Sequence, residues 1–179
     1  MKITLITGSP RRNGNTFALA EAFTKAAEAK GHEVVRFDAA MLQIGGCRAC
    51  MSCYKTGKAC SFDDDFNRIA PHILDADAVV YAAPVYWYSI PAQIKGVIDR
   101  VFSLVVGGKD VAGKKCGIIT CCEEHDPTVM EGVTMPLQRT FALLKWHFVG
   151  QVCIPGVFNE GDIAQTDGCA RAAALAEQF

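Results

Sequence analysis

Short continuous runs of apolar residues alternate along the chain with stretches in which apolar residues recur every three or four positions. A continuous run is typical of a strand that is buried on both faces, and the longer spacing is typical of an amphipathic helix. The clearest run is Ala-Val-Val-Tyr-Ala-Ala at 78–83. The pattern predicts five strands, at residues 3–7, 33–37, 78–83, 116–120 and 152–157.

Helices are predicted between these strands and after the last one, at residues 16–30, 63–74, 91–105, 134–148 and 169–178. Gly31 stands where the first helix should end, and Asn13 or Asn15 is expected to cap its start. The acidic run 63–65 is expected to compensate the dipole of the second helix. Pro71 lies inside that helix and is expected to kink or shorten it.

Five strands that alternate with helices predict an α/β fold with right-handed crossovers. We expect a doubly wound, five-stranded parallel sheet with helices on both faces, which is a three-layer arrangement. The 179 residues show no internal repeat or linker, so residues 1–179 are expected to form a single domain. Ligands of such sheets bind beyond the carboxyl ends of the strands. The loops 8–16, 43–62, 84–90 and 121–129 are therefore where chemistry is expected.

Composition narrows the class of protein. Half of the residues are hydrophobic and 21% are charged, which is enough to bury a full core and excludes a disordered chain. The formal net charge is −1, so no nucleic-acid partner is expected. No stretch is long enough to span a membrane, and the N-terminal apolar run is too short for a signal peptide. We therefore expect a cytoplasmic protein whose nine cysteines are reduced thiols, cofactor ligands or core residues.

The loop 8–16, Gly-Ser-Pro-Arg-Arg-Asn-Gly-Asn-Thr, joins the first strand to a helix N-terminus, where N–H groups and the helix dipole attract a phosphate. Arg11 or Arg12 adds charge, and the usual dinucleotide and nucleoside-triphosphate fingerprints are absent. A polar turn that only caps the helix would not need so many donors. A phosphate monoester site is therefore predicted, with Ser9, Asn13, Asn15 and Thr16 as candidate donors.

The loop 84–91 places three consecutive aromatic residues between two prolines, at the end of the most apolar strand. These side chains can pack under neighbouring loops or in a subunit interface, and they can also form a wall for a flat aromatic ring. Together with the phosphate site, the wall indicates a mononucleotide with a planar ring. The candidate residues are Pro84, Val85, Tyr86, Trp87, Tyr88 and Ser89.

Three segments, at 6–16, in the cysteine loop that ends in Asp63-Asp64, and from 83–86 to 94–100, resemble the group of NAD(P)H-dependent FMN reductases and iron–sulfur flavoproteins, which have a flavodoxin-like fold. The resemblance is strong over residues 1–105 and extends over the remainder in element order only. It implies FMN, with its isoalloxazine against 84–89, near Cys121 and Cys122. The phosphate residues that it implies are Ser9, Arg11, Asn13, Asn15 and Thr16. It also implies NAD(P)H as the reductant and assembly into a homodimer or homotetramer.

In this interpretation the flavin supplies the chemistry, so no catalytic acid or base is predicted. Backbone N–H groups within 84–89 are expected to tune the ring by hydrogen bonding to its polar edge. The predicted activity is the reduction of a flavin, a quinone or a similar small acceptor.

A compact Cys-x2-Cys-x2-Cys-x6-Cys run comprises Cys47, Cys50, Cys53 and Cys60. This spacing suits a 4Fe–4S cluster, which the resemblance to iron–sulfur flavoproteins also implies. Zinc usually takes two separated Cys-x2-Cys pairs, and free thiols that pack a loop are the third interpretation. If a cluster is present, the alternative function is an electron carrier between FMN, the cluster and a redox protein partner. The loop is expected to lie beside the flavin site.

Overall fold

The computed structural model describes residues 1–179 and contains a five-stranded, all-parallel sheet with strand order β2-β1-β3-β4-β5. The strands are β1 (Lys2–Thr7), β2 (Glu33–Asp38), β3 (Ala78–Pro84), β4 (Lys115–Cys121) and β5 (His147–Ile154). The α-helices are α1 (Asn15–Ala29), α2 (Phe66–Asp75), α3 (Ala92–Arg100), α4 (Phe102–Val106), α5 (Glu131–Leu143) and α6 (Gly168–Ala176). Short 3₁₀ segments lie at Ala39–Met41, Pro127–Met130 and Asp162–Gln165.

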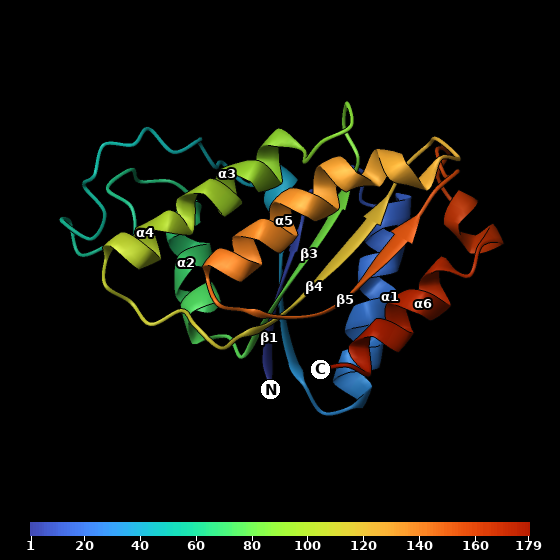
Figure 1. Ribbon diagram of the computed structural model, residues 1–179, viewed down its shortest axis with the longest axis horizontal. Helices are drawn as coiled ribbons and strands as arrows, with labels where there is room; N and C mark the ends of the chain where they lie inside the picture. Colours follow the sequence, from blue (N-terminus) through green and yellow to red (C-terminus); the bar gives the residue numbers. More distant parts are fainter.

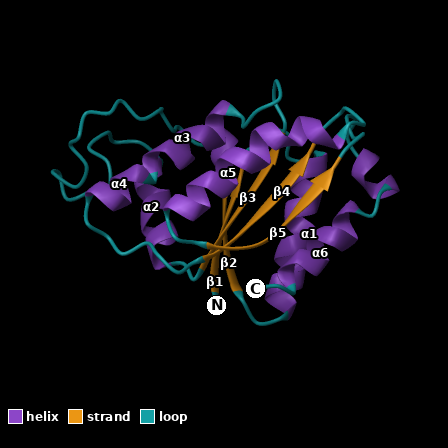
Figure 2. Cartoon of the chain, in the orientation of Figure 1, coloured by secondary structure: helices purple, strands orange, loops and turns teal.

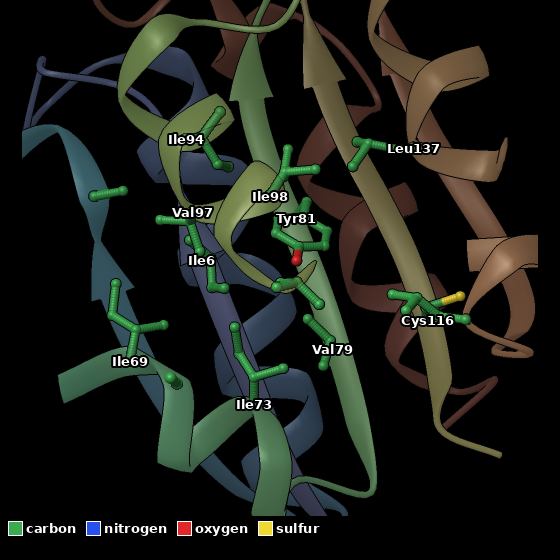
Figure 3. Close-up of a cluster of buried hydrophobic side chains, with 14 of the residues drawn as sticks. Ile6, Ile69, Ile73, Val79, Tyr81, Ile94, Val97, Ile98, Cys116 and Leu137 are labelled. Atoms are coloured by element: carbon green, nitrogen blue, oxygen red, sulfur yellow. The ribbon is translucent and has the colours of Figure 1, made fainter. Parts of the chain in front are cut away.

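Helices cover both faces of the sheet, which gives the flavodoxin-like, three-layer α/β fold that the sequence predicts (Figures 1 and 2). The central strand β3 is buried on both faces, so its side chains enter two cores in alternation. Val79 and Tyr81 pack with α2, α3, α4 and α5, and part of this core is shown in Figure 3. Ala78 and Val80 pack on the other face with α1 and α6.

The largest difference from the predicted elements lies at α5 and β5. The helix predicted at 134–148 ends at Leu143, where Lys145 takes a left-handed φ of 57°, and β5 then begins at His147. The fifth strand is therefore 147–154, and its prediction at 152–157 was wrong at both ends. Phe148 was assigned to the helix because it continues the helical spacing of Phe141. The two rings do lie 6.0 Å apart between centroids, but Phe148 belongs to the neighbouring strand.

Two predictions about helix ends also need correction. The N-cap of α1 is Gly14, and no side chain caps it, so neither Asn13 nor Asn15 has that role. Helix α2 continues through Pro71 to Asp75 and begins only at Phe66. The single helix predicted at 91–105 is two helices, α3 (Ala92–Arg100) and α4 (Phe102–Val106), which meet at Val101. The prediction for the end of α1 is confirmed, since Gly31 follows this helix with a left-handed φ of 81°. No helix in the chain has the length and apolar character that a membrane crossing requires.

Candidate functional site

The carboxyl ends of the strands open on a cleft of about 390 Å³. The loop between β1 and α1 contributes Ser9, Arg11, Gly14, Asn15 and Thr16 to its lining. The loop between β3 and α3 contributes Pro84, Val85, Tyr86 and Trp87, and the segments after β4 and β5 contribute Cys121, Cys122, Glu123, Val157 and Phe158. Most residues predicted for the cofactor site therefore surround one cleft.

The loop before α1 leaves backbone donors free at the helix N-terminus. Its turn is closed by Gly14 N, which donates to the Arg11 carbonyl oxygen at 3.0 Å, and a Cβ on Gly14 would lie 2.9 Å from that of Arg11. The backbone N–H groups of Asn15 and Thr16 have no acceptor in the protein. Such unpaired N–H groups at the start of a 15-residue helix are the donors that a phosphate group takes.

The segment after β5 is tied to the same loop. Arg11 donates from Nη1 to the Phe158 carbonyl oxygen at 3.2 Å, and Asn15 donates from Nδ2 to the Asn159 carbonyl oxygen at 2.9 Å. Asn15 also accepts a hydrogen bond from the backbone N–H of Ile163 at 3.2 Å. This segment was not among the loops predicted from the sequence. The loop after a fifth parallel strand is expected at the same edge of the sheet. Because that strand was predicted to continue to Val157, the loop was not recognised.

Two buried thiols form part of the floor of the cleft. Cys121 lies 3.3 Å from the Thr16 hydroxyl, and burial raises the pKa of Cys121 to about 11. Cys122 donates to the Glu124 carbonyl oxygen at 3.3 Å, and burial raises the pKa of this thiol as well. Both side chains are therefore uncharged at neutral pH, so they present a polarisable surface without charge.

The aromatic loop forms a tight turn closed by two hydrogen bonds of 3.0 Å between Tyr86 and Ser89. Trp87 and Tyr88 occupy its centre with left-handed φ values of 47° and 59°. These conformations are strained for side chains of this size, by about 1–3 kcal/mol each. Trp87 is nevertheless 94% exposed at the edge of the cleft. The backbone N–H groups of Trp87 and Tyr88 have no acceptor in the protein, whereas those of Tyr86 and Ser89 are used within the turn.

Three of the predicted cofactor residues do not line the cleft. Tyr88 and Ser89 are absent from its lining, and their backbone lies against Gly132. Asn13 is exposed and lines a separate groove together with Arg12 and Arg36.

The four loop cysteines line a second, smaller cavity of about 20 Å³, which shares no residue with the first. Cys47 and Cys50 are exposed, Cys53 is half-buried and Cys60 is buried. The loop extends over α4, away from the cleft, and not beside it as the sequence suggested (Figure 1). No three His, Cys, Asp or Glu side chains are gathered closely enough to hold a metal ion.

A buried ion pair fastens the cysteine loop to α3. Nη1 of Arg100 donates to the Asp64 carboxylate and, at 3.3 Å, to the Gly45 carbonyl oxygen. Asp64 also accepts from the backbone N–H groups of Gly45 and Phe66, both at 3.1 Å. The acidic run 63–65, which lies directly before α2, therefore also anchors the cysteine loop through Asp64.

The chemistry of the two cavities fits different groups. The cleft has free N–H donors and a guanidinium at one end and an aromatic and thiol wall at the other, which fits the phosphate and ring of a flavin mononucleotide. The cysteine cavity offers four thiols as soft donors, so its chemistry fits an iron–sulfur cluster, although their present arrangement is not a closed ligand set.

The fold is that of a flavodoxin-like protein, and the cleft lies at the carboxyl ends of its strands, where proteins of this architecture bind their ligands. The NADPH-dependent FMN reductase family matches residues 1–154. The chain belongs to this family of oxidoreductases, and it is related in sequence to iron–sulfur flavoproteins.

An iron–sulfur flavoprotein of Archaeoglobus fulgidus is 30% identical over 166 residues, which cover 91% of this chain and 74% of that protein. One of Methanosarcina thermophila is 36% identical over 100 residues, which cover 56% of this chain and about half, 52%, of that protein. Among solved structures, an NAD(P)H:quinone oxidoreductase from Methanothermobacter marburgensis superposes with a TM-score of 0.79 at 19% identity, over 98% of this chain and 94% of that one. An azoreductase from Bacillus anthracis gives 0.78 at 20% identity, over 100% of both chains.

Proposed function

We propose that this protein binds FMN in the cleft at the strand ends and uses it for the NAD(P)H-dependent reduction of a flavin, a quinone or a similar small acceptor. One observation carries the proposal: the same cleft contains free N–H groups at the N-terminus of α1 and a wall of aromatic and thiol side chains. When bound, FMN supplies the hydride chemistry.

The residues of the chain would bind and orient the cofactor. The N–H groups of Asn15 and Thr16 and the charge of Arg11 would hold the phosphate, and Ser9 lies beside them in the cleft. The free N–H groups in the aromatic turn would donate to the polar edge of the ring. No side chain is assigned as a catalytic acid or base, because hydride transfer to a flavin does not require one.

The exposed aromatic side chain at the open side of the cleft indicates the shape of the acceptor. Trp87 stands exposed at its edge, so a planar molecule can stack there without displacing the core. Proteins of the same fold include one named a quinone oxidoreductase and one named an azoreductase. Quinones and aromatic azo compounds are flat molecules. We therefore assign small, flat acceptors to this cleft.

The test is steady-state oxidation of NADH and of NADPH by FMN-loaded protein, with free flavin, a benzoquinone and an azo dye as acceptors. Turnover with at least one acceptor is expected, together with one FMN per chain. Bound FMN that neither nicotinamide reduces under anaerobic conditions would contradict the proposal.

A second candidate function is electron transfer through a 4Fe–4S cluster to a redox protein partner. It is favoured by one observation, that Cys47, Cys50, Cys53 and Cys60 all line the same cavity. These four thiols would hold the cluster after the exposed part of the loop closes. Iron and acid-labile sulfide are expected at four atoms of each per chain after anaerobic purification, about the content of one cubane. Stoichiometric FMN without iron would contradict this function and leave the first one intact.

A single domain over residues 1–179, a cytoplasmic location and assembly into a homodimer or homotetramer stay predictions. Apolar side chains exposed on α5 and β5, namely Met135, Leu143 and Phe148, provide a surface for association. Sedimentation equilibrium checks the assembly.

A further inference from the structure

Arg11 and Glu123 are the only charged residues that line the cleft. Arg11 belongs to the loop before α1, at the end of the cleft that contains the free N–H donors, and it also donates to the Phe158 carbonyl oxygen. Glu123 directly follows Cys121 and Cys122, the two thiols of the cleft floor. The basic residue therefore belongs to the phosphate end of the cleft, and the acidic residue belongs to the wall assigned to the ring.

The backbone on both sides of Glu123 is fixed to the segment after β5. The carbonyl oxygen of Cys122 accepts a hydrogen bond from the N–H of Val157 at 2.8 Å. The carbonyl oxygen of Glu124 accepts one from the N–H of Gly156 at 2.9 Å. Because both neighbours are held in this way, the fold gives Glu123 a defined position at the cleft.

The acidic residues next to Glu123 are already engaged in contacts. The Glu124 carboxylate lies beside the Tyr88 hydroxyl and raises the pKa of that group. Asp126 accepts hydrogen bonds from the N–H and the hydroxyl of Thr128, at 2.9 and 2.8 Å. Glu123, in contrast, is exposed, and its carboxylate has no hydrogen-bond or ion-pair partner in the protein. The charge of Glu123 is therefore free to act on a molecule that enters the cleft.

A free carboxylate distinguishes incoming molecules by their charge. With Arg11 taken by the phosphate of FMN, Glu123 is the remaining charged side chain of the lining. Two unit charges about 4 Å apart in water interact strongly enough to change an equilibrium constant about fivefold. A like charge on the incoming molecule is disfavoured and an opposite charge is favoured, which separates molecules of similar shape.

We propose that Glu123 selects the electron acceptor by charge, so that the cleft admits uncharged and cationic flat molecules and disfavours anionic ones. This inference rests on the proposed function, the FMN-dependent reduction of an acceptor in this cleft. It adds the charge of the acceptor to the flat shape that Trp87 indicates. Glu123 contributes neither a proton nor a bond to the reaction and acts only on the approach of the acceptor.

The experiment uses full-length, FMN-loaded protein that is reduced with dithionite and mixed anaerobically with an acceptor in a stopped-flow instrument. Naphthoquinone is the uncharged acceptor, and naphthoquinone sulfonate is the anionic one. The second-order rate constant of flavin reoxidation is measured with each acceptor. The ratio of the two constants is then compared among variants, because a change in flavin reactivity affects both constants. Glu160→Gln is the matched control, because Glu160 is exposed on the segment after β5 and does not line the cleft.

Glu123→Gln is expected to raise the ratio of the sulfonate to the naphthoquinone rate constant about fivefold, and Glu123→Lys should raise it further. The difference from wild type should shrink in about 1 M salt, where the Debye length is about 3 Å. Glu160→Gln should leave the ratio unchanged. A wild-type ratio in Glu123→Gln, or an equal rise in Glu160→Gln, would overturn the inference and leave the proposed function intact. Reduced wild-type protein that neither acceptor reoxidises would instead remove the proposed function, and this inference with it.

Discussion

The carbonyl group of Tyr88 lies directly against Gly132, the second residue of α5, and leaves no room for a Cβ at that position. The aromatic turn at the edge of the cleft therefore rests on the first turn of α5. This contact holds the strained backbone of Trp87 and Tyr88 in place, although the two segments are more than forty residues apart in the chain.

Gly132→Ala is expected to destabilise the protein by about 1–3 kcal/mol, because the new methyl group must displace the backbone of the turn. Within an unobstructed helix the same change would stabilise by up to about 1 kcal/mol, so the sign of the effect is diagnostic. Urea unfolding measures the stability, and quenching of FMN fluorescence measures binding, which should weaken as well. Gly46→Ala is the control, since a Cβ there meets no atom within 4 Å. Unchanged or higher stability of Gly132→Ala would contradict the contact.

Asp64→Asn is expected to destabilise the protein by about 3–5 kcal/mol at neutral pH, because it leaves the buried Arg100 charge without its partner. Thermal unfolding measures the loss. Asp63→Asn is the matched control, because Asp63 is 84% exposed and pairs only with Lys58 at the surface. A loss for Asp64→Asn no larger than for this control would show that the ion pair contributes little.

The contribution of Asp64 should also depend on pH. Its burial alone would raise its pKa, but hydrogen bonds from Arg100 and from the N–H of Gly45 outweigh burial and lower it below 3.8. A carboxyl group with a lowered pKa in the folded state stabilises the protein above its unfolded pKa. This stability is lost as the pH falls from about 4 through the lower folded value. Wild type and Asp64→Asn should therefore converge in stability in acid, and a constant difference down to pH 2 would contradict the assignment.

Cys121 should resist alkylation by iodoacetamide in the folded protein. Burial raises its pKa from 9.0 to about 11, which lowers the thiolate fraction roughly a hundredfold at pH 8, and the side chain is also shielded from the reagent. Cys116, whose pKa burial raises to about 12, should behave alike. Mass spectrometry of peptides after timed labelling gives the rates, with the half-exposed Cys169 as internal reference. Labelling of Cys121 as fast as Cys169 would show that the floor of the cleft is open.

Arg11→Ala should weaken FMN binding about tenfold, because a charge-assisted hydrogen bond to the phosphate is lost. Arg12→Ala removes the same charge from the neighbouring residue, which lines a different groove and not the cleft. Its binding constant should remain close to that of wild type. Fluorescence titration with FMN at fixed ionic strength compares the two variants. Equal weakening by both would indicate a general charge effect and not a specific contact.

The central part of the fold was predictable because its signals are local. A short continuous apolar run such as 78–83 is typical of a strand buried on both faces, and the polar loop 8–16 directly follows the first strand. Prediction failed where a tertiary contact has the spacing of a helical one. Phe148 continues the helical spacing of α5 in the sequence, but it packs on Phe141 from β5.

The sequence by itself determined the alternation of strands and helices, the loops at the strand ends and the supply of donors and thiols in them, because these depend on neighbours within a few residues. Only the tertiary structure decided that the segment after β5 is fastened to Arg11 and Asn15, that the cysteine loop lies over α4, and that Arg100 and Ser103 line its cavity. Such relations join residues that are distant in the chain. They arise from strand order and from the packing of helices on the sheet, which no local pattern of residues encodes.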